Sequence, residues 1–145
     1  MKPAATLTIE ADVSQLSRVR QFVGETASSL TPDADAIEDL ILALDEAVTN
    51  VIVHGYQDSP GPVGVTMSFQ SGALIASVCD RAPPYDPTTT PEPDMGLPLE
   101  QRRPGGFGVL LIRHLTDEIR YRRTPDGENE LTLIKKTEMH HEHDH

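Results

Sequence analysis

The chain has 145 residues, enough for one domain of ordinary size and too few for two. Its 12 basic and 23 acidic residues give a formal net charge of −11, which argues against direct nucleic-acid binding because such binding depends on neutralising phosphates. The single cysteine, Cys79, excludes an internal disulfide, and the lack of an apolar membrane span or signal-peptide pattern predicts a cytoplasmic protein with no membrane association.

The N-terminal part of the chain predicts one strand followed by two helices. Residues 6–11 alternate apolar and polar side chains, as a half-buried strand does. Asp12 is a suitable N-cap for the first helix. Thr31-Pro32-Asp33 is a helix-start signal, and the second helix is expected to run to about His54, with Gly55 as its stop.

The C-terminal part predicts four strands and one further helix. Residues 63–69 and 73–79 alternate and form a β-hairpin through a three-residue loop. An apolar helix at about 109–115 precedes two more alternating strands, at 118–123 and 130–136. This order of elements predicts an α+β fold, a two-layer sandwich in which helices cover one face of a mixed, mostly antiparallel sheet.

Two segments stand apart from these elements. Residues 81–104 hold seven of the twelve prolines and predict a long structureless loop, and such loops inside compact domains are often functional lids. The tail, residues 137–145, carries four of the six histidines, and we expect it to be disordered and outside the domain, which spans 1–136.

Glu46 and Asn50 lie four residues apart on the second helix, nearly opposite its apolar stripe, and His54 continues their row. A solvated helix face explains this pattern. Asn and His are poor helix formers, however, and a carboxylate beside an amide oxygen suits Mg²⁺, which prefers oxygen ligands. From spacing alone, both interpretations remain open.

A glycine-rich turn, Gly105-Gly106-Phe107-Gly108, leads directly into the third helix. Free backbone N–H groups at such a helix start can meet a phosphate, although the turn is neither a Walker A loop nor a dinucleotide fingerprint. A tight hinge explains it equally well. Asp80 ends an apolar strand just before the proline-rich loop, where a turn or capping role is common.

Three sequence blocks, taken together, resemble one known family. They are LALDEAVTNVIVHGY (42–56), VCDRAPPYDP (78–87) and GGFGVLLIRHLTDEIRYRRTPDGENELTLIKK (105–136). They are similar to the nucleotide-binding blocks of the anti-sigma regulatory factor serine/threonine kinases, which belong to the histidine-kinase-like ATPase superfamily. The resemblance runs from about residue 6 to 136 and implies that residues 81–104 are a mobile lid over bound ATP.

The resemblance implies roles for individual residues. Glu46 matches the carboxylate proposed as general base, and Asn50 matches the residue that coordinates the Mg²⁺ bridging the ATP phosphates. Asp80 matches the aspartate that accepts the adenine amino group, and Thr132 matches the threonine that supports this contact. The other positions implied at the ATP site are His54 in a supporting role, Ala82, Gly105, Gly106, Phe107 and Gly108.

Ala82 departs from the family pattern, which usually has glycine at this position. If the backbone there needs a positive φ, alanine is strained by about 1 kcal/mol or more and the adenine pocket is perturbed. If the position needs only a small residue, alanine is harmless.

The implied function is an ATP- and Mg²⁺-dependent protein serine kinase that phosphorylates an anti-sigma-factor antagonist of the small STAS type. The same surface would sequester a sigma factor, and the resemblance also implies a homodimer. Two further hypotheses stay open. One is a nucleotide-sensing module that binds its partner without phosphotransfer, which the departure at Ala82 suggests, and the other is an interaction domain that no longer binds nucleotide. The intact Glu46 and Asn50 favour the kinase.

Overall fold

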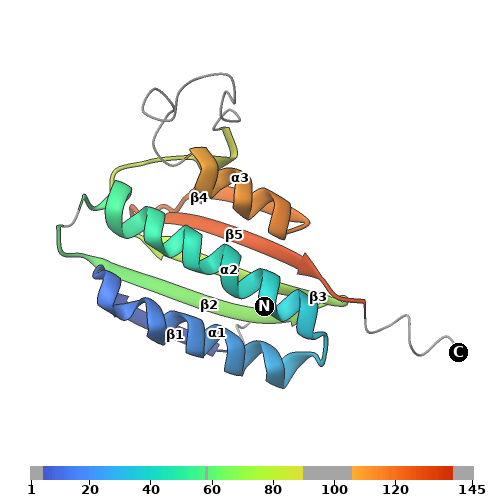
Figure 1. Ribbon diagram of the computed structural model, residues 1–145. Coiled ribbons are helices and arrows are strands. Elements are labelled where there is room, and N and C mark those ends of the chain that lie inside the picture. Colours follow the sequence, from blue (N-terminus) through green and yellow to red (C-terminus); the bar gives the residue numbers. More distant parts are fainter. Residues whose placement is uncertain (1–4, 58, 90–105, 139–145) are drawn as a thin grey trace, which may run out of the picture.

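The computed structural model describes residues 5–57, 59–89 and 106–138 (Figure 1). The helices and strands that were expected from the sequence are all present in this part of the chain, and most of their ends fall within a residue or two of the expected ones. In chain order they are β1 (Ala5–Glu10), α1 (Leu16–Leu30), α2 (Ala34–Asn50), β2 (Pro62–Gln70), β3 (Ala73–Asp80), α3 (Gly106–Leu115), β4 (Glu118–Arg123) and β5 (Asn129–Lys136).

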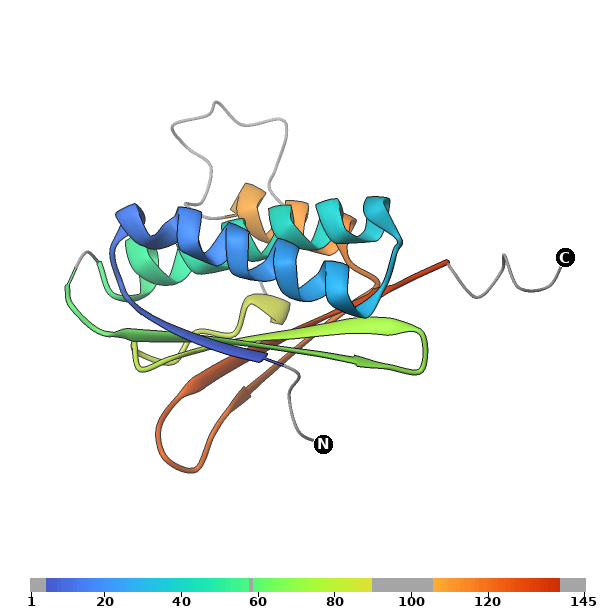
Figure 2. The same ribbon diagram turned by 90° about the horizontal axis from the view of Figure 1, so that it is seen from below.

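The strands form one five-stranded sheet in the order β1-β2-β3-β5-β4. The three helices lie on one side of this sheet, so the two-layer α+β architecture is confirmed (Figure 2). The sheet is not mixed, because each of its four pairings is antiparallel. Within the described residues, no helix is long and apolar enough to cross a membrane.

Side-chain caps define where the two long helices begin. The Asp12 carboxylate accepts a hydrogen bond from Ser14 N–H at 2.9 Å and opens a short 3₁₀ turn, Val13–Gln15, ahead of α1. The Asp33 carboxylate accepts a hydrogen bond from Ala36 N–H at 3.1 Å at the start of α2. These side chains satisfy N–H groups that have no partner within the helix.

The end of α2 differs from the expectation of one continuous helix. Regular α-helix ends at Asn50, and residues Val51–Gly55 continue it as a π-helical turn. This wider turn is a common local feature at functional sites. The chain then leads through Tyr56 into β2.

The hairpin between β2 and β3 has a two-residue turn rather than the expected three-residue loop. Gln70 pairs with Ala73, which leaves only Ser71 and Gly72 between the strands. Both turn residues have positive φ, 53° and 78°, as the tight turns of twisted hairpins require. Ser71 adopts this conformation at some cost, whereas Gly72 adopts it freely.

The core lies between the helical layer and the inner face of the sheet. Alternate residues of β2 and β3 point inward against the apolar stripe of α2. The largest fully buried side chains of this core include Leu40, Leu44, Val48, Ile52, Val65, Met67, Leu74, Ile112 and Leu133.

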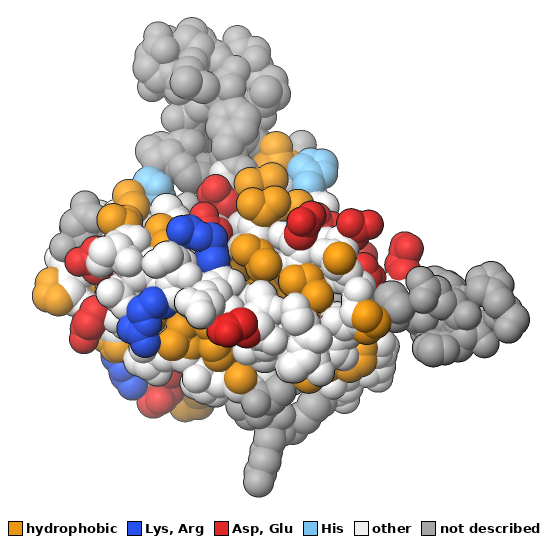
Figure 3. All heavy atoms as spheres, turned by 60° about the horizontal axis from the view of Figure 1, so that its bottom comes forward, with side chains coloured by type: hydrophobic (Ala, Val, Ile, Leu, Met, Phe, Trp, Pro, Cys, Tyr) orange, Lys and Arg blue, Asp and Glu red, His pale blue; other side chains and the backbone are white. Residues whose placement is uncertain are grey.

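Figure 3 shows one face of the surface of the molecule, on which acidic side chains lie among apolar ones and lysines and arginines are scattered.

Two leucines of α2 allow a matched test of this core. Leu44 is fully buried, whereas Leu42 is 53% exposed. We expect Leu44→Ala to lower the free energy of unfolding by about 2–5 kcal/mol, because it leaves a cavity. Leu42→Ala should change it by about 0.5 kcal/mol or less. Urea denaturation followed by circular dichroism measures both, and equal losses for the two variants would contradict this assignment of the core.

Candidate functional site

A cavity of about 660 Å³ lies where α2 and its π-helical turn approach the ends of β3 and β5. Its lining is largely apolar, with a few polar groups that converge on it, as in typical sites for small molecules. Its lining includes eight residues that carry polar groups or shape the cavity wall: Asn50, His54, Tyr56, Asp80, Arg81, Ala82, Tyr121 and Asn129.

Asp80 is the buried acidic group of this cavity, with only 5% of its surface exposed. Its Oδ1 atom accepts hydrogen bonds from Ala82 N–H and from Asn129 Nδ2, each at 2.9 Å. Its Oδ2 atom accepts no hydrogen bond from the described part of the chain. Among the described residues, every fully enclosed side-chain oxygen or nitrogen has a hydrogen-bond partner. Oδ2 is therefore free to accept a hydrogen bond from a molecule in the cavity.

Ala82 occupies its position without backbone strain. Among the described residues other than glycine, only Gln57 and Ser71 have positive φ. Ala82 is 3% exposed, and a Cβ atom placed on Gly55 would lie 3.2 Å from the Ala82 Cβ. The position therefore needs a small side chain that can pack against the π-helical turn, not glycine's freedom in φ.

Asn129, and not Thr132, stands beside Asp80. The two residues pair directly across β3 and β5, whereas Thr132 pairs with Ser77 on the opposite face of the sheet. There the Thr132 and Ser77 hydroxyls form a hydrogen bond of 2.9 Å. The expectation that Thr132 supports the contact at Asp80 therefore needs correction, because strand residues an odd number of positions apart face opposite sides.

Asn129 was missed by the sequence analysis, although its signal is present in the sequence. Leu131 and Leu133 mark the inward side of β5, and Asn129 falls on the same side by alternation. A polar residue at an inward position next to a strand end is a candidate site residue. The structure adds the reason that this residue is tolerated there, since both the nitrogen and the oxygen of its amide have hydrogen-bond partners.

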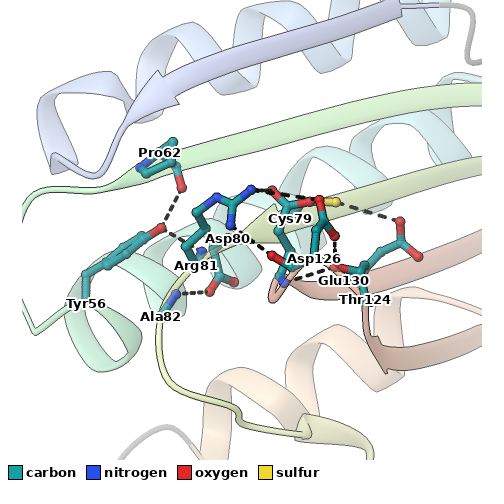
Figure 4. A network of polar contacts seen from close by, with 10 residues as sticks. Tyr56, Pro62, Cys79, Asp80, Arg81, Ala82, Thr124, Asp126 and Glu130 are labelled. Atoms are coloured by element: carbon teal, nitrogen blue, oxygen red, sulfur yellow. Dashed lines mark hydrogen bonds and ion pairs between the residues drawn. The ribbon is translucent and has the colours of Figure 1, made fainter.

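A polar network holds the backbone that follows Asp80 (Figure 4). The Tyr56 hydroxyl accepts a hydrogen bond from Arg81 N–H and donates one to the Pro62 carbonyl oxygen, both at 2.7 Å. The Arg81 guanidinium donates to the Asp126 carbonyl oxygen at 3.1 Å, which ties this segment to the turn between β4 and β5. Burial raises the pKa of Tyr56, so its hydroxyl keeps the proton that it donates.

Glu46 and Asn50 face the first turn of α3 across the helical layer. A Cβ atom placed on Gly108 would lie 3.1 Å from Glu46 Oε2, 3.1 Å from Asn50 Nδ2 and 3.3 Å from Asn50 Oδ1. Both side chains are partly buried, so they do not form the simple solvated face that spacing alone allowed. A side chain at position 108 would require the two polar groups to move by a few tenths of an ångström, so glycine suits this close approach of the α3 backbone.

The other expected site residues are placed less completely. His54 is exposed and lines the cavity from the π-helical turn. Gly106 and Phe107 form the start of α3, while Gly105 lies outside the described residues. The expected lid is described only to residue 89, with a 3₁₀ turn at Pro87–Thr89, and the histidine-rich tail is described only to residue 138.

These groups suit a molecule with a hydrogen-bond donor at one end and negative charge at the other. Asp80 Oδ2 can accept from the donor, and the first-turn N–H groups of α3, which have no partner within the helix, can attract anionic oxygens. Glu46 and Asn50 offer oxygen atoms of the kind that Mg²⁺ prefers. The described residues contain no group of three or more His, Cys, Asp or Glu that could hold a metal alone. Mg²⁺ commonly takes ligands from bound phosphates and water as well as from the protein.

The open antiparallel sheet, its helical layer and this cavity define an ATPase-type fold of the histidine-kinase class. A family model for the histidine kinase-like ATPase domain matches residues 9–135, and the chain belongs to this family.

Several characterised proteins are similar to the chain, and they are named as serine or serine/threonine protein kinases. The kinase BtrW of Bordetella bronchiseptica is 33% identical over 65% of this chain and 66% of its own length. RsbW of Halalkalibacterium halodurans is 30% identical over 78% of this chain and 72% of its own length. RsbW of Listeria monocytogenes is 30% identical over 83% of this chain and 80% of its own length.

A solved structure shares the fold. The crystal structure of the RsbU and RsbW domains of Rv1364c from Mycobacterium tuberculosis superposes with a TM-score of 0.63 at 24% identity. The match covers 93% of this chain and 33% of that one. The present chain thus corresponds to about a third of the mycobacterial protein.

Cys79 gives a test of the electrostatics beside the site. Burial, and then the nearby Glu130 carboxylate, raise the pKa of the Cys79 thiol to about 12. Its thiolate fraction at pH 8 is then about one in ten thousand, so we expect the iodoacetamide alkylation rate to keep rising between pH 8 and 10. Glu130→Gln should lower the pKa and raise the rate at pH 8. A wild-type rate that levels off as the pH approaches 10, as for an ordinary thiol with a pKa of about 8.5, would contradict this picture.

Proposed function

We propose that this chain is a protein serine kinase that uses Mg²⁺-ATP and also acts as an anti-sigma factor. The proposal rests chiefly on one observation, the close approach of Gly108 to Glu46 and Asn50 at the start of α3. Glu46 is a potential base, Asn50 a potential metal ligand, and the α3 start a potential phosphate site. The kinase names of the relatives support the same conclusion.

In this proposal, each group acts on a different part of the nucleotide. Asp80 Oδ2 accepts the adenine amino hydrogen, and the first-turn N–H groups of α3 bind phosphate oxygens. Asn50 supplies its amide oxygen to Mg²⁺. When bound, Mg²⁺ neutralises charge on the phosphates.

Glu46 acts on the protein substrate. Its carboxylate orients the serine hydroxyl of a partner protein and takes up its proton as the phosphoryl group is transferred. Because the transition state of phosphoryl transfer is loose, catalysis depends mainly on positioning and on stabilising charge. Glu46 therefore has to be held correctly more than it has to be strongly basic.

The proposed substrate is a STAS-type anti-sigma-factor antagonist, and the proposed second partner is a sigma factor. Phosphorylation of the antagonist would leave the kinase free to hold the sigma factor. We also propose a cytoplasmic location and a homodimer. The net charge of −11 supports regulation through proteins rather than through direct contact with nucleic acid.

A nucleotide-sensing module without phosphotransfer is the second hypothesis. This hypothesis was based on the backbone strain that a positive φ at Ala82 would cause, but Ala82 does not have a positive φ. No other described feature of the site favours this hypothesis over a kinase.

Asn50→Ala tests the metal ligand. We expect the variant to fold normally and to lose Mg²⁺-dependent ATP binding, because its amide oxygen is removed. Calorimetric titration with ATP, with and without Mg²⁺, measures this after deletion of residues 139–145, whose histidines could bind metal. Thr49→Ala is the matched control, since the Thr49 hydroxyl donates a hydrogen bond to the carbonyl oxygen of Asp45 in its own helix, at 2.7 Å. Unchanged Mg²⁺-ATP affinity in Asn50→Ala would remove Asn50 from the site.

Glu46→Gln tests the proposed base. The amide retains the size of the side chain but not its proton affinity, so ATP binding should persist while phosphotransfer falls by about 10²–10⁴-fold. The measurement is the rate at which labelled γ-phosphate is transferred from ATP to a STAS-type protein that has been isolated through its binding to the wild-type chain. Asp45→Asn is the control, because Asp45 pairs with Arg20 on the α1 side of the helix. An undiminished transfer rate in Glu46→Gln would show that Glu46 is not the base.

A further inference from the structure

We infer that Asn129, held in place by Tyr121, restricts the Asp80 carboxylate to a single available acceptor atom and thereby selects adenine over guanine nucleotides. The inference rests on the proposed function, because it concerns the same nucleotide cavity. It goes further by assigning base selectivity to two residues that no motif indicated. Asn129 acts through Asp80, so it is a positioning residue.

The N–H hydrogens of the Asn129 amide are taken up by acceptors of the protein itself. Asn129 is 6% exposed, and its Nδ2 atom lies 2.9 Å from Asp80 Oδ1, 3.1 Å from the Ala82 carbonyl oxygen and 3.2 Å from the Pro83 carbonyl oxygen. Three acceptors therefore share its two N–H hydrogens. Its Oδ1 atom accepts a hydrogen bond from the Tyr121 hydroxyl. The N–H groups of Asn129 therefore act on a nucleotide through the groups that they hold, chiefly Asp80.

The orientation of this amide follows from its surroundings. A rotation of the amide by 180° would turn its oxygen toward the Asp80 carboxylate and two carbonyl oxygens, which is electrostatically unfavourable. The same rotation would lose the hydrogen bond that the Tyr121 hydroxyl donates to Asn129 Oδ1. Tyr121 and the three acceptors therefore favour the same orientation.

This amide occupies one oxygen of the Asp80 carboxylate. Oδ1 accepts hydrogen bonds from Ala82 N–H and Asn129 Nδ2, which uses both lone pairs of that atom. Oδ2 remains for the ligand. The cavity wall here is also fixed, since the Ala82 carbonyl oxygen accepts one hydrogen bond from Asn129 and another from Arg123 Nη1, the latter at 3.0 Å.

A carboxylate with one available oxygen distinguishes the two purines. Adenine presents one amino group on its Watson–Crick edge, which a single oxygen satisfies. Guanine presents two adjacent donors, its ring N–H and its amino group, and a carboxylate satisfies both only when both of its oxygens are available. With Oδ1 occupied, a bound guanine would keep one donor unpaired in a buried site, and that is costly.

Calorimetric titration of the full chain with ADP and with GDP, each with Mg²⁺, tests the inference. We expect the wild type to prefer ADP. Asn129→Ala frees one of the two lone pairs of Asp80 Oδ1, so the ratio of the GDP Kd to the ADP Kd should fall by about tenfold or more. Tyr121→Phe should lower the same ratio by a smaller factor, because the amide loses the donor that orients it. Thr132→Val is the matched control on the same strand, and its outward side chain should leave the ratio unchanged.

The ratio separates selectivity from damage to the fold, since a loosened cavity would weaken ADP and GDP binding together. If Asn129→Ala and Tyr121→Phe keep the wild-type ratio, the inference is wrong while the proposed function stands. A wild type that binds ADP and GDP equally also overturns the inference alone, whereas a wild type that binds no ADP contradicts both. If circular dichroism shows Asn129→Ala to be unfolded, Tyr121→Phe decides the question by the same criterion.

Discussion

The buried hydrogen bond between Asp80 and Asn129 is the contact on which the cavity depends. A carboxylate that is 5% exposed requires hydrogen-bond partners, because an isolated buried charge is very costly. The partner comes from β5, which is 49 residues away along the chain but directly opposite in the sheet. A shift in register of one residue would turn Asp80 to the outer face and bring Cys79 inward. The packing of the apolar residues Val78 and Leu131, which pair in the same ladder, holds the register that places the carboxylate in the cavity.

The helical layer supplies the second half of the site from one continuous segment. Glu46 and Asn50 project from the last turns of α2 toward Gly108, and the π-helical turn beyond them presents His54 and Gly55 to the cavity. The wider turn therefore does more than end the helix, since Gly55 packs against Ala82 across the cavity wall. The two halves, helical and sheet-derived, meet at this contact. The lack of a side chain at Gly55 and the single methyl group of Ala82 permit the two segments to approach each other.

Two positions, Ala82 and Asn129, differ from what the resemblance implied, and the structure gives the physical reason for each. Ala82 replaces the usual glycine, and its ordinary φ explains why the replacement is tolerated. Asn129 takes the inward position next to Asp80, where the resemblance pointed to Thr132. An amide with three acceptors and one donor around it organises both the carboxylate and the following backbone.

Local sequence patterns are enough to predict the helices and strands, because alternation, helix periodicity and caps such as Asp12 and Asp33 act over a few residues. They also predict that Glu46 and Asn50 share a helix face. Four features became known only from the folded chain: the all-antiparallel pairing, the π-helical turn, the conformation of Ala82 and the position of Asn129, rather than Thr132, beside Asp80. The conformation of Ala82 and the choice of Asn129 follow from contacts between segments far apart in the chain. Local preferences cannot specify which residue of a distant strand will stand opposite Asp80, because that is set by packing and register across the whole sheet.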